Sequence, residues 1–261
     1  MAALSDMGFA ALYGLGATLV LAVATWVVSL IKRDASIVDS MWSILILSAG
    51  IVYAILLPDG GTRAVIVLIL AALWATRLTA YITWRNWGEA EDHRYQAIRQ
   101  RNEPGYALKS VYLVFGLQAV LAWIVSMSLL ATAATSRPLS WMDAPGVALV
   151  LFGILFEATG DWQLARFKSE PANRGNVMDR GLWRYTRHPN YFGEFCAWWG
   201  FYLLAAMGGG WWTIVSPLLM SVLLLKVSGV SLLEKDIGER RPGYREYVAR
   251  TNAFIPGSPK P

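Results

Sequence analysis

Long apolar runs separated by polar segments dominate this chain of 261 residues. Most of the runs are about twenty residues long, which is the length that an α-helix needs to cross the hydrocarbon core of a bilayer. The pattern therefore predicts an all-α polytopic membrane protein with seven transmembrane helices. The predicted spans are Gly8–Ile31, Ile37–Leu57, Ala64–Trp84, Ser110–Ala134, Ala144–Phe167, Tyr191–Trp211 and Thr213–Val230.

Positive charges are distributed very unevenly between the segments that connect these spans. Of the 23 Lys and Arg residues, twenty lie after the first, third and fifth spans or in the C-terminal tail. Only Arg63 and Arg137 lie in the opposite loops, and Arg77 lies inside a span. Because cytoplasmic loops carry the excess of positive charge, this asymmetry predicts an external N-terminus and a cytoplasmic C-terminus. Topology and anionic lipid headgroups then explain the net charge of +5, and no nucleic-acid partner is predicted.

Composition agrees with a single membrane domain over residues 1–261 and excludes several classes of site. The chain is 56% hydrophobic and 16% charged, against about 25% charged residues in soluble domains. The single Cys196 excludes an internal disulfide, and two histidines are too few for a His-rich di-iron centre, so no metal site is predicted. The start has no basic segment before its first apolar run, so no cleavable signal peptide is expected.

Polar side chains recur inside the predicted spans, mostly in their cytoplasmic halves. Several share a helix face by their spacing of four, seven or eight residues. These sets are Arg77, Tyr81 and Arg85; Glu157, Asp161 and Lys168; and Asn190 and Glu194. A charge at membrane depth costs a few kcal/mol, so it faces either a partner or a wet cavity. Both remain open here: ion pairs between helices, such as Arg77 with Glu157 or Asp161, or a ligand site on the cytoplasmic side.

The segment "GLWRYTRHPNYFGE", residues 181–194, concentrates polar groups directly before the sixth predicted span. Pro189 suits the first turn of a helix, and His188 before it is pushed out of helical geometry. His188 alone fits an interfacial histidine as well as a functional one. The basic run either sets topology or holds phosphates, because guanidinium groups match phosphate oxygens. Its members are Arg180, Arg184 and Arg187.

At this point the motifs resemble a known family. "GLWRYTRHPNYFGE", the tail "LLEKDIGERRPGYREYVARTNAFIP" and the N-terminal "DASIVDSMW" and "LWATRLTAYITWRNWGEAEDHRY" are similar to the steroid 5-alpha-reductase superfamily, in particular to its bacterial branch of unknown function. The similarity extends over nearly the whole chain. The RHPxYxGE element is less specific, because it also occurs in isoprenylcysteine carboxyl methyltransferases and related membrane methyltransferases.

The resemblance implies a seven-helix membrane reductase that transfers hydride from NADPH to a conjugated C=C bond. Its lipophilic substrate, a steroid, sterol or other enone, would enter from the lipid. A substrate half would occupy about residues 1–135 and a cofactor half about residues 136–261, with the site facing the cytoplasm at a bacterial inner membrane. No G-x-G-x-x-G motif is present, as the resemblance leads us to expect.

Matching the family's motifs position by position gives the expected site residues. The cofactor-binding set implied by these matches and by the basic loop is Arg77, Tyr81, Arg85, Asp161, Lys168, Arg184, Tyr185, Arg187, His188, Asn190, Glu194 and Glu234. Two departures concern the substrate side: Trp74 replaces a family tyrosine, and the family's Gln-Glu pair is missing, with Asp39 in that region. An indole cannot deliver a proton as a phenol does, and Asp39 could serve as a donor at the substrate oxygen only when protonated.

Two other functions stay open at the level of the sequence. An S-adenosylmethionine-dependent membrane methyltransferase shares the RHPxYxGE element, although five spans precede that element here. A channel, or a structural or partner-binding membrane protein, would need only an intramembrane ion pair.

Overall fold

The computed structural model describes residues 4–227 and 243–260, and in these residues the regular structure is entirely helical. Within these described residues, five helical segments are long and apolar enough to cross a membrane, as expected of a polytopic membrane protein. They are Leu4–Lys32, Ile37–Leu56, Pro58–Asn86, Tyr106–Val125 and Trp141–Ser169. Each overlaps one of the first five predicted spans.

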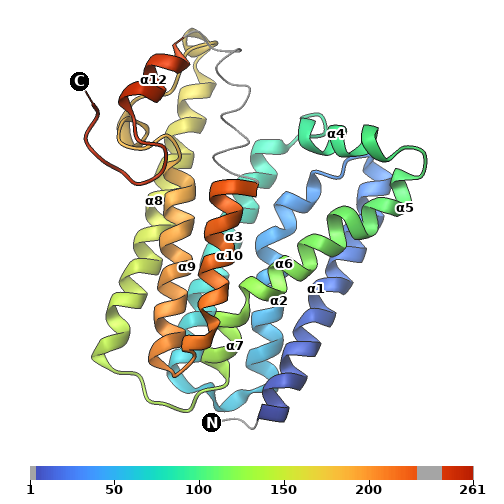
Figure 1. Cartoon of the computed structure of the whole chain (residues 1–261), viewed down its shortest axis with the longest axis vertical. Coiled ribbons are helices and arrows are strands. Elements are labelled where there is room, and N and C mark those ends of the chain that lie inside the picture. Colours follow the sequence, from blue (N-terminus) through green and yellow to red (C-terminus); the bar gives the residue numbers. More distant parts are fainter. Residues whose placement is uncertain (1–3, 228–242, 261) are drawn as a thin grey trace. The chain divides into compact units, whose positions relative to one another are not determined.

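The helices are labelled in Figure 1. Their bounds are α1 Leu4–Lys32, α2 Ile37–Leu56, α3 Gly61–Asn86, α4 His93–Asn102, α5 Tyr106–Ser110, α6 Leu117–Val125, α7 Met127–Ala133, α8 Ala144–Ser169, α9 Pro189–Met207, α10 Val215–Val222 and α12 Tyr244–Arg250. Short 3-10 turns and two π-helical segments connect some of them; the π-helical segments are Val111–Gly116 and Leu223–Val227.

The chain forms two compact units. The first contains residues 1–141 and 204–216, and the second contains residues 142–203 and 217–261. The boundary near residue 141 lies close to the predicted division at residue 135, but the segment 204–216 returns to the first unit. That the whole chain is one membrane domain stays a prediction.

In the first unit, α2 lies between α1 and α3 (Figure 1). The α2–α3 contact is partly polar: the hydroxyls of Ser43 and Thr79 are 2.8 Å apart, and Thr79 also donates to the Ser40 carbonyl at 3.0 Å. At the N-terminal end of α3, the buried Arg63 donates to the carbonyls of Arg137 and Pro138 at 2.8 and 3.0 Å. These bonds satisfy polar groups that lipid cannot hydrate.

The fourth predicted span, Ser110–Ala134, is not one continuous α-helix. It contains a π-helical segment and breaks between α6 and α7 at Ser126, which is fully buried. The Ser126 hydroxyl donates to the Trp123 carbonyl at 2.7 Å and lies 2.9 Å from the Tyr53 hydroxyl on α2. A serine that bonds back to the preceding turn bends a helix, and hydropathy alone does not predict such a bend.

In the second unit, α8 and α9 pack through small residues. A Cβ added at Gly153 would lie 2.5 Å from both the Gly193 carbonyl and the Ala197 amide, and one added at Gly193 would lie 2.6 Å from the Glu157 amide. Such close backbone contact is typical of small residues between membrane helices. It brings the middle of α8 directly against the first half of α9.

Candidate functional site

The second unit holds the polar groups that the sequence placed on the cofactor side. Glu157, Asp161 and Glu194 are all buried, with at most 7% of each residue exposed. The glycine contacts between α8 and α9 explain why these groups gather. Gly193 packs on the backbone of Glu157, and Gly160 lies against the backbone N–H of Asn190. At the same height along the two helices, α8 and α9 therefore carry three carboxyl groups and the side-chain amide of Asn190.

The turn into α9 has the predicted local geometry. Pro189 is the first residue of the helix and His188 precedes it, outside helical structure. The His188 ring is buried and stacks on Tyr191 at 5.6 Å between ring centroids, with an angle of 5° between the planes. Both local expectations for Pro189 and His188 are confirmed.

The three arginines of the basic run have different surroundings. Arg180 and Arg184 are exposed, and Tyr185 beside them is 45% exposed. Arg187 is buried, and its guanidinium donates to the carbonyls of Thr251 and Val248 at 2.6 and 3.2 Å, at the C-terminal end of α12. Arg187 therefore neutralises the carbonyl end of a helix, where a cation is stabilising.

The C-terminal tail packs onto the same turn. Thr186 donates its hydroxyl to the Phe254 carbonyl at 2.7 Å, and the Tyr185 carbonyl accepts from the Gly257 amide at 3.0 Å. The Phe254 ring meets the rings of Phe192 and Phe195 edge to face, at centroid distances of 5.8 and 5.4 Å. The tail thus fixes the start of α9, and with it the position of Asn190.

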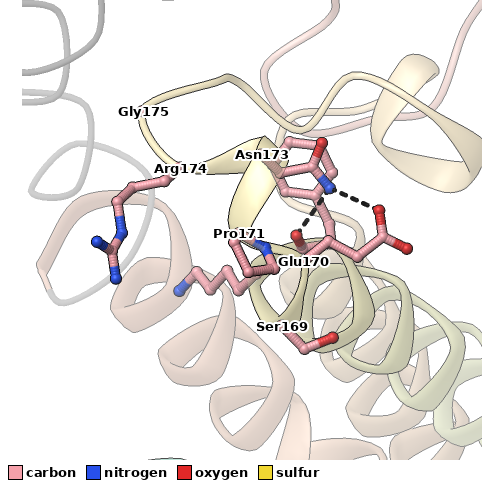
Figure 2. A pocket seen from close by; sticks show the side chains of 8 residues that line it. Ser169, Glu170, Pro171, Asn173, Arg174 and Gly175 are labelled. Atoms are coloured by element: carbon pink, nitrogen blue, oxygen red, sulfur yellow. Dashed lines mark hydrogen bonds between the residues drawn. The ribbon is translucent and has the colours of Figure 1, made fainter.

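Lys168 does not share the buried environment of Glu157 and Asp161, although the sequence placed the three on one face. It is exposed and lines a pocket of about 260 Å³ at the end of α8, together with Arg174. Figure 2 shows Arg174 extending away from the turn that follows α8, while Asn173 donates to Glu170 at 3.3 Å on the other side. Glu170 also lines this pocket, so two cations outnumber one carboxylate there, and the excess of positive charge suits an anionic group.

In the first unit, Asp39 lies in the first turn of α2 and is bound on both of its oxygens. Arg94 donates to Oδ2 at 2.6 Å and the Tyr95 hydroxyl donates to Oδ1 at 2.6 Å. This is the arrangement of an ionised carboxylate that accepts charge-assisted bonds. That Asp39 acts as a protonated donor at the substrate oxygen stays a prediction.

Asp92 completes this cluster by accepting two bonds from the Arg94 guanidinium, at 2.9 and 3.1 Å. Burial acts to raise the pKa of the Asp92 carboxyl, but the bonds from Arg94 outweigh it and hold that pKa below its usual value. Burial, together with the charge of Asp39, raises the pKa of the Tyr95 phenol well above its usual range, so this hydroxyl stays protonated.

The sequence did not single out Asp92, Arg94 or Tyr95. They stand in "EDHRY", between two apolar runs, and an acid next to a cation and an aromatic residue is the signal that could have found them. Their contact with Asp39 joins residues more than fifty positions apart, which the pattern of spans alone does not predict.

The remaining expected residues of the first unit lie along α3. Trp74 is fully buried, Arg77 is half-buried, and the Arg85 guanidinium lies 5.9 Å from the centre of the Tyr81 ring. The shared helix face of Tyr81 and Arg85 is confirmed by this cation–π contact. Glu234 lies outside the described residues.

The profile of the family described as "Protein of unknown function (DUF1295)" matches residues 25–251. The chain belongs to this family. It is also 28% identical, over 278 aligned residues, to an uncharacterized protein of the fission yeast Schizosaccharomyces pombe, an alignment that covers 93% of this chain and 78% of the yeast protein. No solved structure matches the chain. The region that the family profile matches contains every expected site residue.

Proposed function

We propose that the protein is an NADPH-dependent membrane reductase that transfers hydride to a conjugated C=C bond of a lipophilic enone. The observation that carries the proposal is the level of α8 and α9 with three buried carboxyl groups beside Asn190. Buried charges between apolar helices are costly and mark functional sites in membrane proteins. The resemblance of the surrounding motifs to steroid 5-alpha-reductases supplies the reaction class.

The donor set fits a dinucleotide. Asn190 is half-buried, and its side-chain amide makes no hydrogen bond to the described part of the chain. It would bind the nicotinamide amide or a ribose hydroxyl, together with Asp161 and Glu194. When bound, the nicotinamide supplies the hydride, and the protein holds and orients the cofactor.

Phosphates of the cofactor would lie at exposed cations of the same unit. Arg184 and Lys168 are exposed, whereas Arg187 is buried and its guanidinium binds the carbonyls of Val248 and Thr251. We therefore assign Arg184 and Lys168 to phosphates and Arg187 to the tail. Tyr185 and His188 would line the cofactor site beside this turn. Arg77, Tyr81 and Arg85 belong to the first unit, and their cofactor contact stays a prediction.

On the substrate side, Asp39 would act by holding the Tyr95 hydroxyl and the Arg94 guanidinium in place. A donor near the substrate oxygen stabilises the negative charge that hydride transfer places there. Trp74, fully buried, would contact the apolar substrate.

Titration of the detergent-purified protein with NADPH, S-adenosylmethionine or buffer tests the function. We expect NADPH at a hundred times its Kd to stabilise the fold by about 2.7 kcal/mol, seen as a rise in Tm, with no effect of S-adenosylmethionine. Asn190→Ala and Arg184→Gln should each weaken NADPH binding about tenfold or more, because each removes a hydrogen-bonding partner of the cofactor.

Arg137→Gln is the matched control, because it removes a cation from a loop on the opposite side of the predicted topology. It should bind NADPH like the wild type. Stabilisation by S-adenosylmethionine alone would instead identify a methyltransferase, and stabilisation by neither compound would reject both enzymes.

The finer topology is also part of the proposal: seven spans, with the N-terminus outside and the C-terminus in the cytoplasm of a bacterial inner-membrane protein. The sixth and seventh spans would be α9 and the apolar helix Trp211–Val227; the predicted end of the seventh span at Val230 lies outside the described residues. The support is the position of twenty of the 23 Lys and Arg residues on one side.

Reporters fused to the two ends of the chain measure this topology. A C-terminal alkaline phosphatase fusion should be inactive and a C-terminal fluorescent protein bright, because both report a cytoplasmic end. The N-terminal fusion should give the opposite result. Two ends that report from the same side of the membrane would contradict seven spans.

A further inference from the structure

A second pocket, of about 500 Å³, lies in the first unit, where α1 ends, α2 begins and α3 ends. Its charged lining residues are Lys32, Arg33, Asp34, Glu89 and Glu91, and its polar ones include Ser36, Ser40, Thr83 and Asn86. None of these residues belongs to the proposed reductase site. The volume is within the range of pockets that hold small ligands.

The pocket has as many positive as negative charges once the ion pair between Glu91 and Arg99 is set aside. Glu91 is neutralised by Arg99, whose guanidinium donates to both of its oxygens at 2.7 and 3.1 Å. The ammonium of Lys32, the guanidinium of Arg33 and the carboxylate of Glu89 make no ion pair with any described residue.

Asp34 accepts bonds only from its neighbour Ser36 in the described chain, at the backbone amide and the hydroxyl. Two cations and two carboxylates are therefore left to face the pocket. A ligand with one negative and one positive group would satisfy both kinds, whereas a purely anionic ligand would leave the carboxylates opposed.

The position of the pocket along the helices suits contact with lipid headgroups. It is bounded by the ends of three helices that are long enough to cross the membrane. Trp84 and Trp87 beside it are 65% and 79% exposed. Exposed tryptophans at the end of a membrane helix mark the interface between lipid and water, because one part of the ring is apolar and the indole N–H seeks a polar partner.

From these observations we infer that the pocket binds the phosphoethanolamine headgroup of a membrane phospholipid. Its phosphate would lie at Lys32 and Arg33, and its ammonium at Asp34 and Glu89. A primary ammonium has three N–H donors for carboxylate, hydroxyl and amide oxygens. A choline group has none and is recognised by several aromatic rings, but Trp87 alone supplies a ring here.

Native mass spectrometry of the full-length protein with equimolar dioleoyl phosphatidylethanolamine, phosphatidylcholine and phosphatidylglycerol tests the inference. We expect phosphatidylethanolamine to be retained about tenfold more than either of the others. Lys32→Gln and Arg33→Gln should each lower retention of phosphatidylethanolamine about tenfold, because each removes a charge-assisted contact to the phosphate.

Glu89→Gln separates a headgroup pocket from simple attraction of phosphates to cations. It should remove the preference for phosphatidylethanolamine over phosphatidylglycerol while leaving phosphatidylglycerol binding at least as strong. Arg101→Gln, at an exposed and unpaired arginine of α4 in the same unit, is the charge-matched control and should bind like the wild type.

Soluble O-phosphoethanolamine distinguishes the two sources of this chemistry. It should compete with the lipid only weakly, because it lacks acyl chains. Equal retention of the three lipids, or equal binding by Arg33→Gln and Arg101→Gln, would overturn the inference. So would displacement by soluble O-phosphoethanolamine at the concentration of the lipid, since the ligand would then be a soluble zwitterion.

Discussion

Gly193→Val is expected to prevent the second unit from folding. A Cβ at Gly193 would lie 2.6 Å from the Glu157 amide and 2.6 Å from the Gly153 carbonyl, and both are backbone atoms that cannot turn aside. Forcing extra atoms into a packed contact costs about 1–3 kcal/mol even where side chains can adjust, so the loss here should be at least about 3 kcal/mol. The measurement is the yield of monodisperse protein in detergent, together with its Tm.

Gly16→Ala provides the control, because a Cβ at this helical position in α1 would meet no atom within 4 Å. It should leave yield and Tm unchanged or slightly raised, since alanine favours a helix over glycine. A Gly193→Val protein as stable as the wild type would show that α8 and α9 do not pack through Gly153 and Gly193.

Arg94→Leu is expected to destabilise the first unit by about 3 kcal/mol. The side chains of Asp39 and Arg94 are only 19% and 24% exposed, and removal of one partner leaves the charge of the other without its nearest counterion. Tyr95→Phe, which removes a single donor to Asp39, should cost about 1–2 kcal/mol. Thermal unfolding in detergent measures both.

A double-mutant cycle shows whether this loss comes from the pair. Asp39→Asn combined with Arg94→Leu should be less destabilised than the sum of the single variants, because neither charge is then left alone. Arg101→Leu is the control on the exposed face of α4 and should change stability by less than about 0.5 kcal/mol. Additive effects in the cycle would mean that Asp39 and Arg94 do not interact.

The hydrophobic pattern predicted the first five spans because the length and composition of an apolar helix are local properties. The conformational preference of Pro189 likewise predicted the start of α9, and the spacing of Tyr81 and Arg85 predicted that they share a helix face. The break at Ser126 was missed because it depends on a hydroxyl that bonds to its own helix and approaches Tyr53.

The candidate site was only partly predictable for a similar reason. Spacing identified Asp161, Asn190 and Glu194, because each lies on a helix whose face the sequence defines. It could not reveal that Arg187 binds the carbonyls at the end of α12, since that contact joins positions more than sixty residues apart. Asp39 was found as an isolated acid, while its partners Arg94 and Tyr95 come from a separate helix.

The docking of the tail on the turn before α9 constrains how the chain is completed during synthesis. Residues 186 and 187 bond to carbonyls at residues 248–254, which are translated more than sixty positions later. Domains generally fold from the N-terminus as they emerge from the ribosome. Here the turn that positions Asn190 can reach its final arrangement only after residues 248–254 have emerged from the ribosomal exit tunnel. A truncation after Arg250 would leave every predicted span in place and still remove the Thr251 and Phe254 carbonyls that this turn binds.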